Sequence, residues 1–185
     1  MFIQTEATPN PATLKFIPGK PVLPGGTREY RKAADALESP LAEKLFGVTG
    51  VSGVFLGHDF ITVTKGGGEW QHLKPAILGT IMDHYLSGAP VLADAAIPEP
   101  EGEEFFADEH SEVVKTIKDL LESRVRPAVA QDGGDITFKG FKEGIVYLNM
   151  KGSCAGCPSS TATLKHGIEN LLRHFVPEVT EVRPV

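Results

Sequence analysis

The two cysteines of this 185-residue chain, Cys154 and Cys157, are the residues best suited to chemistry. They lie in a Cys-x-x-Cys sequence inside a segment rich in glycine and serine, residues 152–160. Two intervening residues let both sulfur atoms face one point, which suits one metal centre or one disulfide. The spacing of apolar residues after the pair predicts a helix. The positive end of the helix dipole would lie near Cys157 and favour the thiolate over the thiol. Lys151 and Lys165 would favour the thiolate in the same way if they lie close to it.

Three of the four interpretations of this pair leave part of the sequence unexplained. Packing cysteines are not usually found in a loop rich in glycine and serine. A thioredoxin-like dithiol fits the order strand, Cys-x-x-Cys, helix, but too few residues follow Cys157 to complete such a sheet. Structural zinc needs four ligands, and although His166 could supply a third, the usual second pair is absent.

The fourth interpretation supplies the missing ligands by symmetry. An iron–sulfur cluster is normally held by four thiolates, and a two-fold homodimer of this chain would provide them from Cys154 and Cys157 of each copy. A cluster between two protomers lies at a surface and is held less permanently than one inside a single chain. The pattern therefore favours a carrier that releases its cluster by exchanging these thiolates for those of a client.

The elements needed to position the cysteines are predicted in the last 75 residues. Apolar residues between 113 and 121 predict a helix that Arg126-Pro127 breaks or kinks. Strands are expected at 136–141 and 145–150, joined as a hairpin. The helix after the cysteines is expected to be capped by Ser159 or Ser160, to end at Pro177 and to be followed by a strand at 179–182.

A second α+β domain is predicted for residues 1–90. Strand-like segments are expected near the N-terminus and at 13–17, and a hairpin at 51–64. Ser39-Pro40 predicts a capped helix, and apolar spacing predicts another over 70–86. The fold class is therefore α+β, with two small mixed domains: residues 1–90, an acidic linker at 91–110, and residues 111–185.

Charge identifies the linker. The net charge is −6, and residues 91–110 contain seven acidic residues with no lysine or arginine, whereas the flanking regions are close to neutral. Repelling charges and two prolines predict an extended spacer over 93–109. Phe105-Phe106 is too apolar for a bare spacer, so these residues either dock on a domain or anchor a partner.

Several functional classes are disfavoured by composition. An acidic chain has no general attraction to nucleic acid, and no apolar run approaches the roughly 20 residues that cross a bilayer. Two cysteines are too few for a disulfide scaffold. The scattered histidines form no evident catalytic set, so we expect a protein that is not an enzyme.

Two sets of motifs resemble a known family. Arg126-Pro127, Asp132-Gly133-Gly134-Asp135 and residues 152–160 resemble the C-terminal domain of NifU-like proteins. Three further motifs resemble the N-terminal domain of Nfu-type proteins: residues 8–11 (Thr-Pro-Asn-Pro), 39–42 (Ser-Pro-Leu-Ala) and 53–57 (Gly-Val-Phe-Leu-Gly). Together these resemblances cover most of the chain outside the linker.

The resemblance implies a carrier that binds a [4Fe–4S] cluster, or less often a [2Fe–2S] cluster, between two protomers. Its cluster ligands fall on Cys154 and Cys157. Its partners are then a second copy, an upstream assembly scaffold and apo iron–sulfur proteins, with no nucleic acid and no membrane. The chain starts almost directly at a strand, so a bacterial-type cytoplasmic location is expected. The alternative is a dithiol redox adaptor or zinc-binding module on the same fold.

Overall fold

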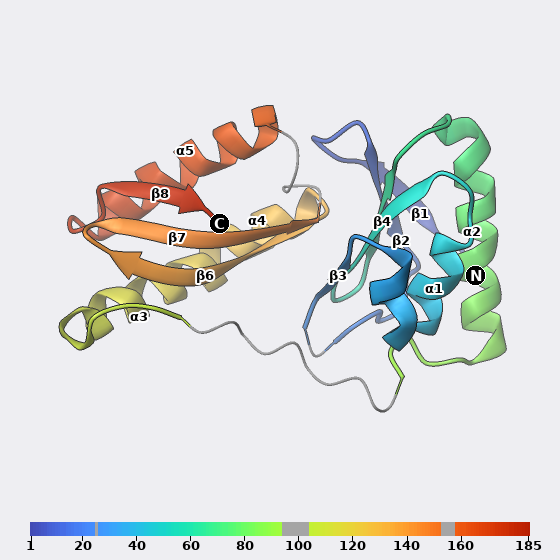
Figure 1. Cartoon of the computed structure of the whole chain (residues 1–185), viewed down its shortest axis with the longest axis horizontal. Helices are drawn as coiled ribbons and strands as arrows, with labels where there is room; N and C mark the ends of the chain where they lie inside the picture. The colour runs from blue at the N-terminus through green and yellow to red at the C-terminus, as the bar shows by residue number, and fades with distance from the viewer. Residues whose placement is uncertain (25, 94–103, 153–157) are drawn as a thin grey trace. The chain divides into compact units, whose positions relative to one another are not determined.

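The computed structural model describes residues 1–24, 26–93, 104–152 and 158–185, without the side chains of 158–161. The chain forms two compact units, Met1–Pro98 and Glu99–Val185, each with helices and a sheet of its own (Figure 1). The predicted α+β class with two small domains is confirmed. The boundaries 1–90, 91–110 and 111–185 stay a prediction.

The first unit is a five-stranded antiparallel sheet with strand order β1-β2-β5-β4-β3. Its strands are β1 (Gln4–Ala7), β2 (Thr13–Ile17), β3 (Arg28–Tyr30), β4 (Val51–Leu56) and β5 (Ile61–Lys65). Its helices are the 3-10 helix η1 (Ala33–Glu38), α1 (Pro40–Phe46) and α2 (Trp70–Ser87). The predicted hairpin and both predicted α-helices are present.

Both α-helices of this unit cover one face of its sheet (Figure 1). The core between the two layers includes Phe16 and Ile61 from the sheet, Leu45 from α1, and Ile77 and Ile81 from α2, all fully buried. The cap of α1 is the predicted one. The Ser39 hydroxyl accepts a hydrogen bond from the Ala42 N–H at 3.1 Å and donates one to the Val91 carbonyl at 2.6 Å.

The second unit contains a three-stranded sheet of order β6-β7-β8. Strand β6 (Gly134–Lys142) is antiparallel to β7 (Ile145–Gly152), and β8 (Glu181–Pro184) is parallel to β7. The helical elements are the 3-10 helix η2 (Asp108–His110), α3 (Ser111–Leu120), the π-helical turn η3 (Leu121–Val125), α4 (Arg126–Gln131) and α5 (Pro158–Phe175).

Alternating residues place the core of this unit on one face of the sheet. Val146, Leu148 and Met150 of β7 are buried, and Ile117 of α3 and Leu172 of α5 cover them in the same apolar cluster. This core shares no residue with that of the first unit. In the part of the chain described, no helix is long and apolar enough to span a bilayer.

One local prediction needs correction, and another, the break or kink at Arg126-Pro127, is narrowed. Helix α5 already begins at Pro158, so Ser159 and Ser160 lie in its first turn and do not precede it as a cap. Proline suits this position because the first N–H groups of a helix have no intrahelical partner. The chain near Arg126-Pro127 does not break but passes through the π-helical turn into α4, consistent with the missing N–H of Pro127.

Residues 94–103 of the predicted linker lie outside the described residues, whereas residues 104–110 pack on the second unit. The Phe105 N–H donates to the Lys139 carbonyl at 3.2 Å, and the Phe141 N–H donates to the Phe105 carbonyl at 2.8 Å. These bonds add one residue to the free edge of β6 opposite Gly140. Of the two alternatives for the aromatic pair, the structure therefore shows docking on a domain.

Candidate metal centre

Both predicted ligands, Cys154 and Cys157, fall in residues 153–157, which lie outside the described part of the chain. The structure describes both ends of this segment, Gly152 at the end of β7 and Pro158 at the start of α5. Gly152 has a φ of 70°, a left-handed conformation that glycine adopts without steric cost. Because the cysteines are three residues apart, their Cα atoms can be separated by at most about 11 Å.

Helix α5 provides a fixed base for the end of the segment. Its residues Ile168 and Leu172 are buried in the core of the second unit. The helix starts directly after Cys157, so its unpaired N–H groups and the positive end of its dipole lie next to that residue in the chain. This is the environment that the sequence predicts for a thiolate.

The start of β6 lies beside the strand end from which the segment leaves. Gly134 is paired with Gly152, and Asp135 with Lys151, in the antiparallel register of β6 and β7. Gly133, with a φ of 82°, makes the turn from α4 into β6. The structure therefore brings the Asp132–Asp135 motif next to Gly152, the residue after which the Cys-x-x-Cys segment starts, although the two are some 20 residues apart in sequence.

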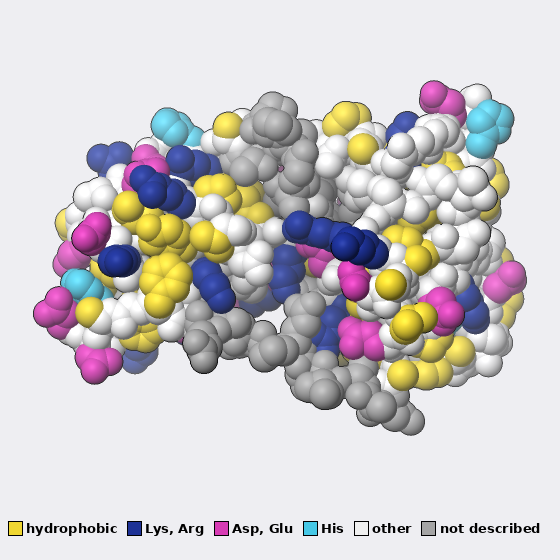
Figure 2. All heavy atoms as spheres, viewed as in Figure 1, with side chains coloured by type: hydrophobic (Ala, Val, Ile, Leu, Met, Phe, Trp, Pro, Cys, Tyr) yellow, Lys and Arg dark blue, Asp and Glu magenta, His cyan; other side chains and the backbone are white. Residues whose placement is uncertain are grey.

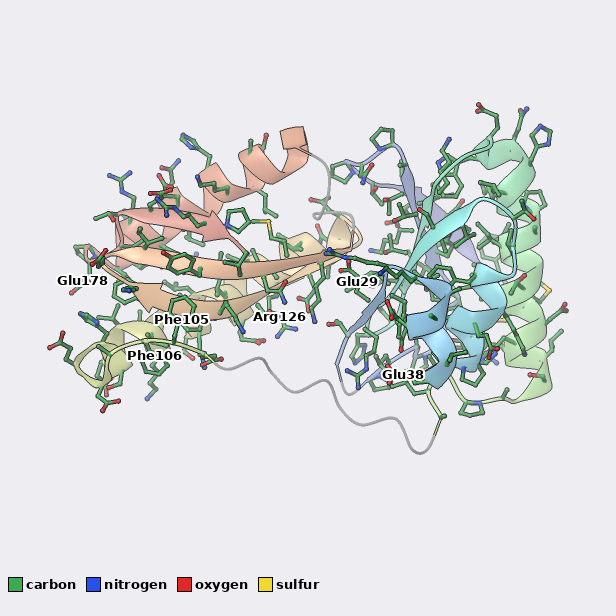
Figure 3. All side chains as sticks on the ribbon, in the orientation of Figure 1. Glu29, Glu38, Phe105, Phe106, Arg126 and Glu178 are labelled. Carbon is green, nitrogen blue, oxygen red and sulfur yellow. The ribbon has the colours of Figure 1, made fainter. Side chains whose placement is uncertain are left out.

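An ion pair ties this strand to the helical layer. The Asp135 side chain is 6% exposed, and its two oxygens accept hydrogen bonds from Arg126 Nε at 2.9 Å and Nη2 at 3.0 Å. Asp135 Oδ1 also accepts from the Ile136 N–H at 2.8 Å. Arg126 (labelled in Figure 3) forms a second ion pair with Glu122. The hydrogen bonds that Arg126 donates to Asp135 are the main cause of the raised pKa of Arg126, and Glu122 raises it further.

In the sequence, Arg126 and Asp135 were recognised only as members of the family motifs, and their ion pair was not predicted. They are nine residues apart, on a helix and a strand. No periodicity links two such positions. The only signal in the sequence is that both belong to the same cluster of motif residues.

Of the other residues considered, Lys151 lies in β7 one residue before Gly152, whereas Lys165 and His166 lie farther along α5. Lys165 Nζ is 3.7 Å from Glu181 Oε1 of β8, so this lysine has a carboxylate partner of its own. His166 is exposed, eight residues along α5 from Pro158, which is about 12 Å along the helix axis. Within the described residues, no group of three His, Cys, Asp or Glu side chains could hold a metal ion.

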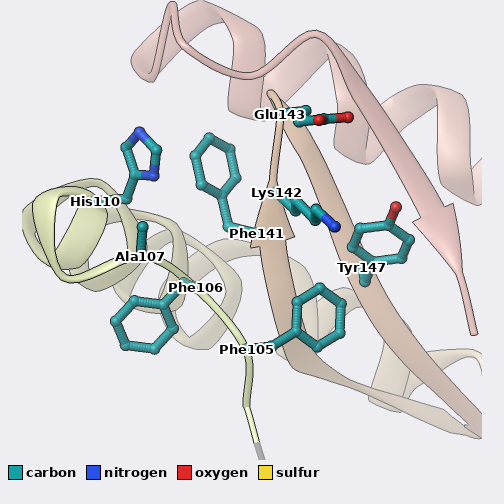
Figure 4. Close-up of a pocket in the computed structure, with 8 residues that line it drawn as sticks. All are labelled: Phe105, Phe106, Ala107, His110, Phe141, Lys142, Glu143 and Tyr147. Carbon is teal, nitrogen blue, oxygen red and sulfur yellow. The ribbon is translucent and has the colours of Figure 1, made fainter.

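A separate aromatic hollow lies at the other end of β7. It has a volume of about 810 Å³, and its lining includes Phe105, Phe106, His110, Phe141 and Tyr147 (Figure 4). Hydrophobic side chains also gather on the sheet side of this unit, bordered by lysine and arginine (Figure 2). The hairpin end of β7 is about 23 Å along the strand from Gly152, the residue after which the Cys-x-x-Cys segment starts.

Two family models match the chain. Residues 3–88 match the scaffold protein Nfu/NifU N-terminal domain, and residues 117–183 match the NifU-like domain. Among curated relatives, the mitochondrial NFU1 iron-sulfur cluster scaffold homolog of Homo sapiens is 52% identical over all of this chain and 72% of its own length. The homolog of Drosophila sechellia is 49% identical over all of the chain and 65% of its own. The mitochondrial NifU-like protein 4 of Arabidopsis thaliana is 49% identical over 98% of the chain and 65% of its own length.

These names contradict the expected bacterial-type cytoplasmic location, because the relatives are mitochondrial proteins. The expectation rested on the first residues of the given sequence alone, and the names of the relatives overturn it. The two domain matches and the extent of identity settle the family. The chain belongs to the Nfu-type, NifU-like family of iron–sulfur cluster scaffolds and carriers.

Proposed function

We propose that this protein carries an iron–sulfur cluster as its cargo, held between two copies of the chain by Cys154 and Cys157 of each, and delivers it to apo-proteins. The observation that carries this proposal is the position of the cysteines. Both lie within the five residues that join the end of β7 to the first turn of α5. The names of the relatives as iron–sulfur cluster scaffold homologs support the same role.

The number of ligands requires a second chain. A cluster is normally held by four thiolates, and this chain contains two cysteines in all. A two-fold axis through the cluster would bring the same segment of each protomer to it, giving four equivalent sulfur ligands. We propose a [4Fe–4S] cluster as the main cargo, with [2Fe–2S] as the alternative.

Transfer proceeds by ligand exchange. A client thiolate binds iron as one cysteine thiolate of the carrier leaves it, so the number of iron–sulfur bonds is maintained at each step. As Cys154 and Cys157 of each copy are replaced, the link between the protomers is lost and the dimer loosens. No covalent catalysis is needed, so the protein acts as a binding protein and not as an enzyme. An upstream assembly scaffold supplies the cluster, and apo iron–sulfur proteins receive it.

The test is anaerobic native mass spectrometry of the chain after addition of iron and sulfide. We expect a dimer whose additional mass equals one cluster and identifies its type. Cys154→Ala and Cys157→Ala should each lose the stable cluster and the cluster-dependent dimer. The matched control is Ser153→Ala, which changes the same segment but keeps both thiols and should retain the cluster. Circular dichroism should show that all variants remain folded.

Three results would contradict this proposal. One is a single cysteine variant that still holds a full cluster. Another is a monomer with one zinc ion, which would favour the zinc module. The third is a monomer lighter by two hydrogen atoms that regains them on reduction, which would favour the dithiol redox adaptor.

A further inference from the structure

The ion pair between Arg126 and Asp135 links a helix and a strand of the second unit. It joins the helical layer, side chain to side chain, to the start of β6. The carboxylate is nearly buried and binds the guanidinium through both oxygens, so neither group can rotate without losing a hydrogen bond. Such a contact determines orientation more strictly than an ion pair with one hydrogen bond.

On the helical side, the position of Arg126 is fixed by the core. It directly follows the π-helical turn η3, whose Leu121 and Val125 are buried. Turns of this kind are rare in proteins overall, and those that occur often lie at functional sites. A second carboxylate, Glu122, binds the guanidinium from within the same helical segment. The arginine is therefore held on a rigid base.

On the strand side, Asp135 is one residue pair away from the cysteine segment. It is opposite Lys151, and the next pair, Gly134 and Gly152, is the last before residue 153. A shift of Asp135 moves the β6 backbone and, through the strand ladder, the point where the segment starts. The connection from Arg126 to the segment thus consists of one bidentate ion pair and one pair of hydrogen-bonded strands.

We propose that Arg126 and Asp135 are positioning residues for cluster binding, which set the start of the 153–157 segment so that both cysteines face one cluster. This inference rests on the proposed function. A buried ion pair is weak evidence for stability, because desolvation of both groups offsets much of their attraction. Groups that hydrogen-bond metal ligands commonly change metal affinity about 10- to 100-fold when they are replaced, and we expect an effect in the same direction from residues that fix the strand end before the ligands.

The experiment measures how long the reconstituted full-length dimer keeps its cluster when an iron chelator is added, followed by visible absorbance. The variants are Arg126→Gln, Asp135→Asn and Arg126→Lys, the last of which keeps the charge but not the two-pronged geometry. The matched control is Arg28→Gln in the first unit, where Arg28 is 5% exposed in its side chain and its Nε lies 3.4 Å from Glu38 Oε1. Melting temperatures of the apo forms are measured in parallel.

We expect Arg126→Gln and Asp135→Asn to release the cluster about tenfold faster or more, with Arg126→Lys in between. Arg28→Gln should lower the melting temperature of its unit and leave the lifetime of the cluster unchanged. A wild-type lifetime in folded Arg126→Gln and Asp135→Asn would overturn the inference. If Arg126→Gln does not fold, Arg126→Lys and Asp135→Asn decide by the same criterion.

The two proposals fail in different ways. If the wild-type protein holds no cluster, both are overturned. If the wild-type protein holds a cluster that Cys154→Ala loses, but the Arg126 and Asp135 variants retain it normally, the carrier function stands and only the positioning role is overturned. Equal losses in Arg28→Gln and Arg126→Gln would also overturn it, because a general loss of stability would explain both.

Discussion

The imidazole of His84 in α2 is fully buried in the first unit, and within the described residues neither ring nitrogen has a partner at hydrogen-bond geometry. Burial is the main cause of the lowered pKa of His84, and the charge of Lys44 lowers it further, while the backbone of Ala89 and Pro90 offsets part of this effect. The ring also packs edge-on against Tyr85, with ring centroids 5.8 Å apart. A neutral histidine is therefore part of the core of this unit.

This burial makes the first unit sensitive to acid. Below the ordinary histidine pKa of about 6.5, the unfolded chain takes up a proton that the folded chain resists, so the free energy of unfolding falls as the pH falls. The slope reaches at most about 1.4 kcal/mol per pH unit for one group. We predict that His84→Phe reduces the difference in stability between pH 7 and pH 5, measured by urea unfolding. The exposed His72, replaced by Phe, is the control, and an unchanged difference in His84→Phe would contradict the prediction.

At the residue scale, the sequence predicts residues whose chemistry is local. It points to Cys154 and Cys157 as the cluster ligands, which stays a prediction, and it correctly identifies Ser39 as a helix cap. It does not reveal the pairing of Arg126 with Asp135, because that contact depends on the tertiary arrangement of a helix and a strand. His84 was treated as a scattered histidine, and its burial depends on packing that no spacing rule predicts.

At the element scale, the long periodic segments were predictable and the short or irregular ones were not. Strand β2 and helix α2 follow clear alternation or helical spacing. Strand β3 has only three residues, and its place at the edge of the sheet depends on pairing with β4. The π-helical turn η3 reads as ordinary helix in sequence. At Gly167 of α5, the structure places no described atom outside the nearby backbone of its own helix within 4 Å of where its Cβ would be.

A second glycine, Gly140 in β6, shows the opposite situation. A Cβ atom there would lie 2.4 Å from the ring of Phe105. We therefore predict that Gly140→Ala displaces Phe105 from β6 and from Tyr147, whose ring centroid is 5.1 Å away. Chymotrypsin, which cleaves after phenylalanine, should then cut at Phe105 or Phe106 several-fold faster than in the wild type.

The control for this experiment is Gly167→Ala. It makes the same chemical change at an exposed helical position, where alanine is favoured over glycine by about 1 kcal/mol. Its cleavage rate at Phe105 and Phe106 should equal that of the wild type. A wild-type rate for Gly140→Ala would show that the aromatic ring is not held by this close contact.

At the scale of the whole molecule, the chain contains two separate cores. We predict that Leu172→Ala lowers the stability of the second unit by about 2–5 kcal/mol and leaves the unfolding transition of the first in place. Leu45→Ala should do the reverse. Differential scanning calorimetry of the full chain resolves the two transitions, and a common shift of both would contradict independent cores.

The two-domain α+β architecture was predictable because each half carries its own apolar periodicity and the charge imbalance lies between them. The location was not predicted correctly, because the expectation rested on the first residues of the chain alone and the names of the relatives contradict it. The bounds of the linker stay a prediction, but its last residues contact the second unit. Residues 104–110 look acidic and spacer-like, but Phe105 pairs with β6 and Glu104 forms an ion pair with Lys118.

The hydrogen bond from the Ala93 N–H to the Glu38 carbonyl fixes the chain to the first unit, and Glu104 and Phe105 fix it to the second. Eleven residue steps join Ala93 to Glu104, a contour of about 40 Å at most. A protein bound to one unit is therefore kept near the other unit by this tether, and its effective concentration there is in the millimolar range. A protein that binds the first unit only weakly would thus encounter the Cys-x-x-Cys segment far more often than its concentration in solution would suggest.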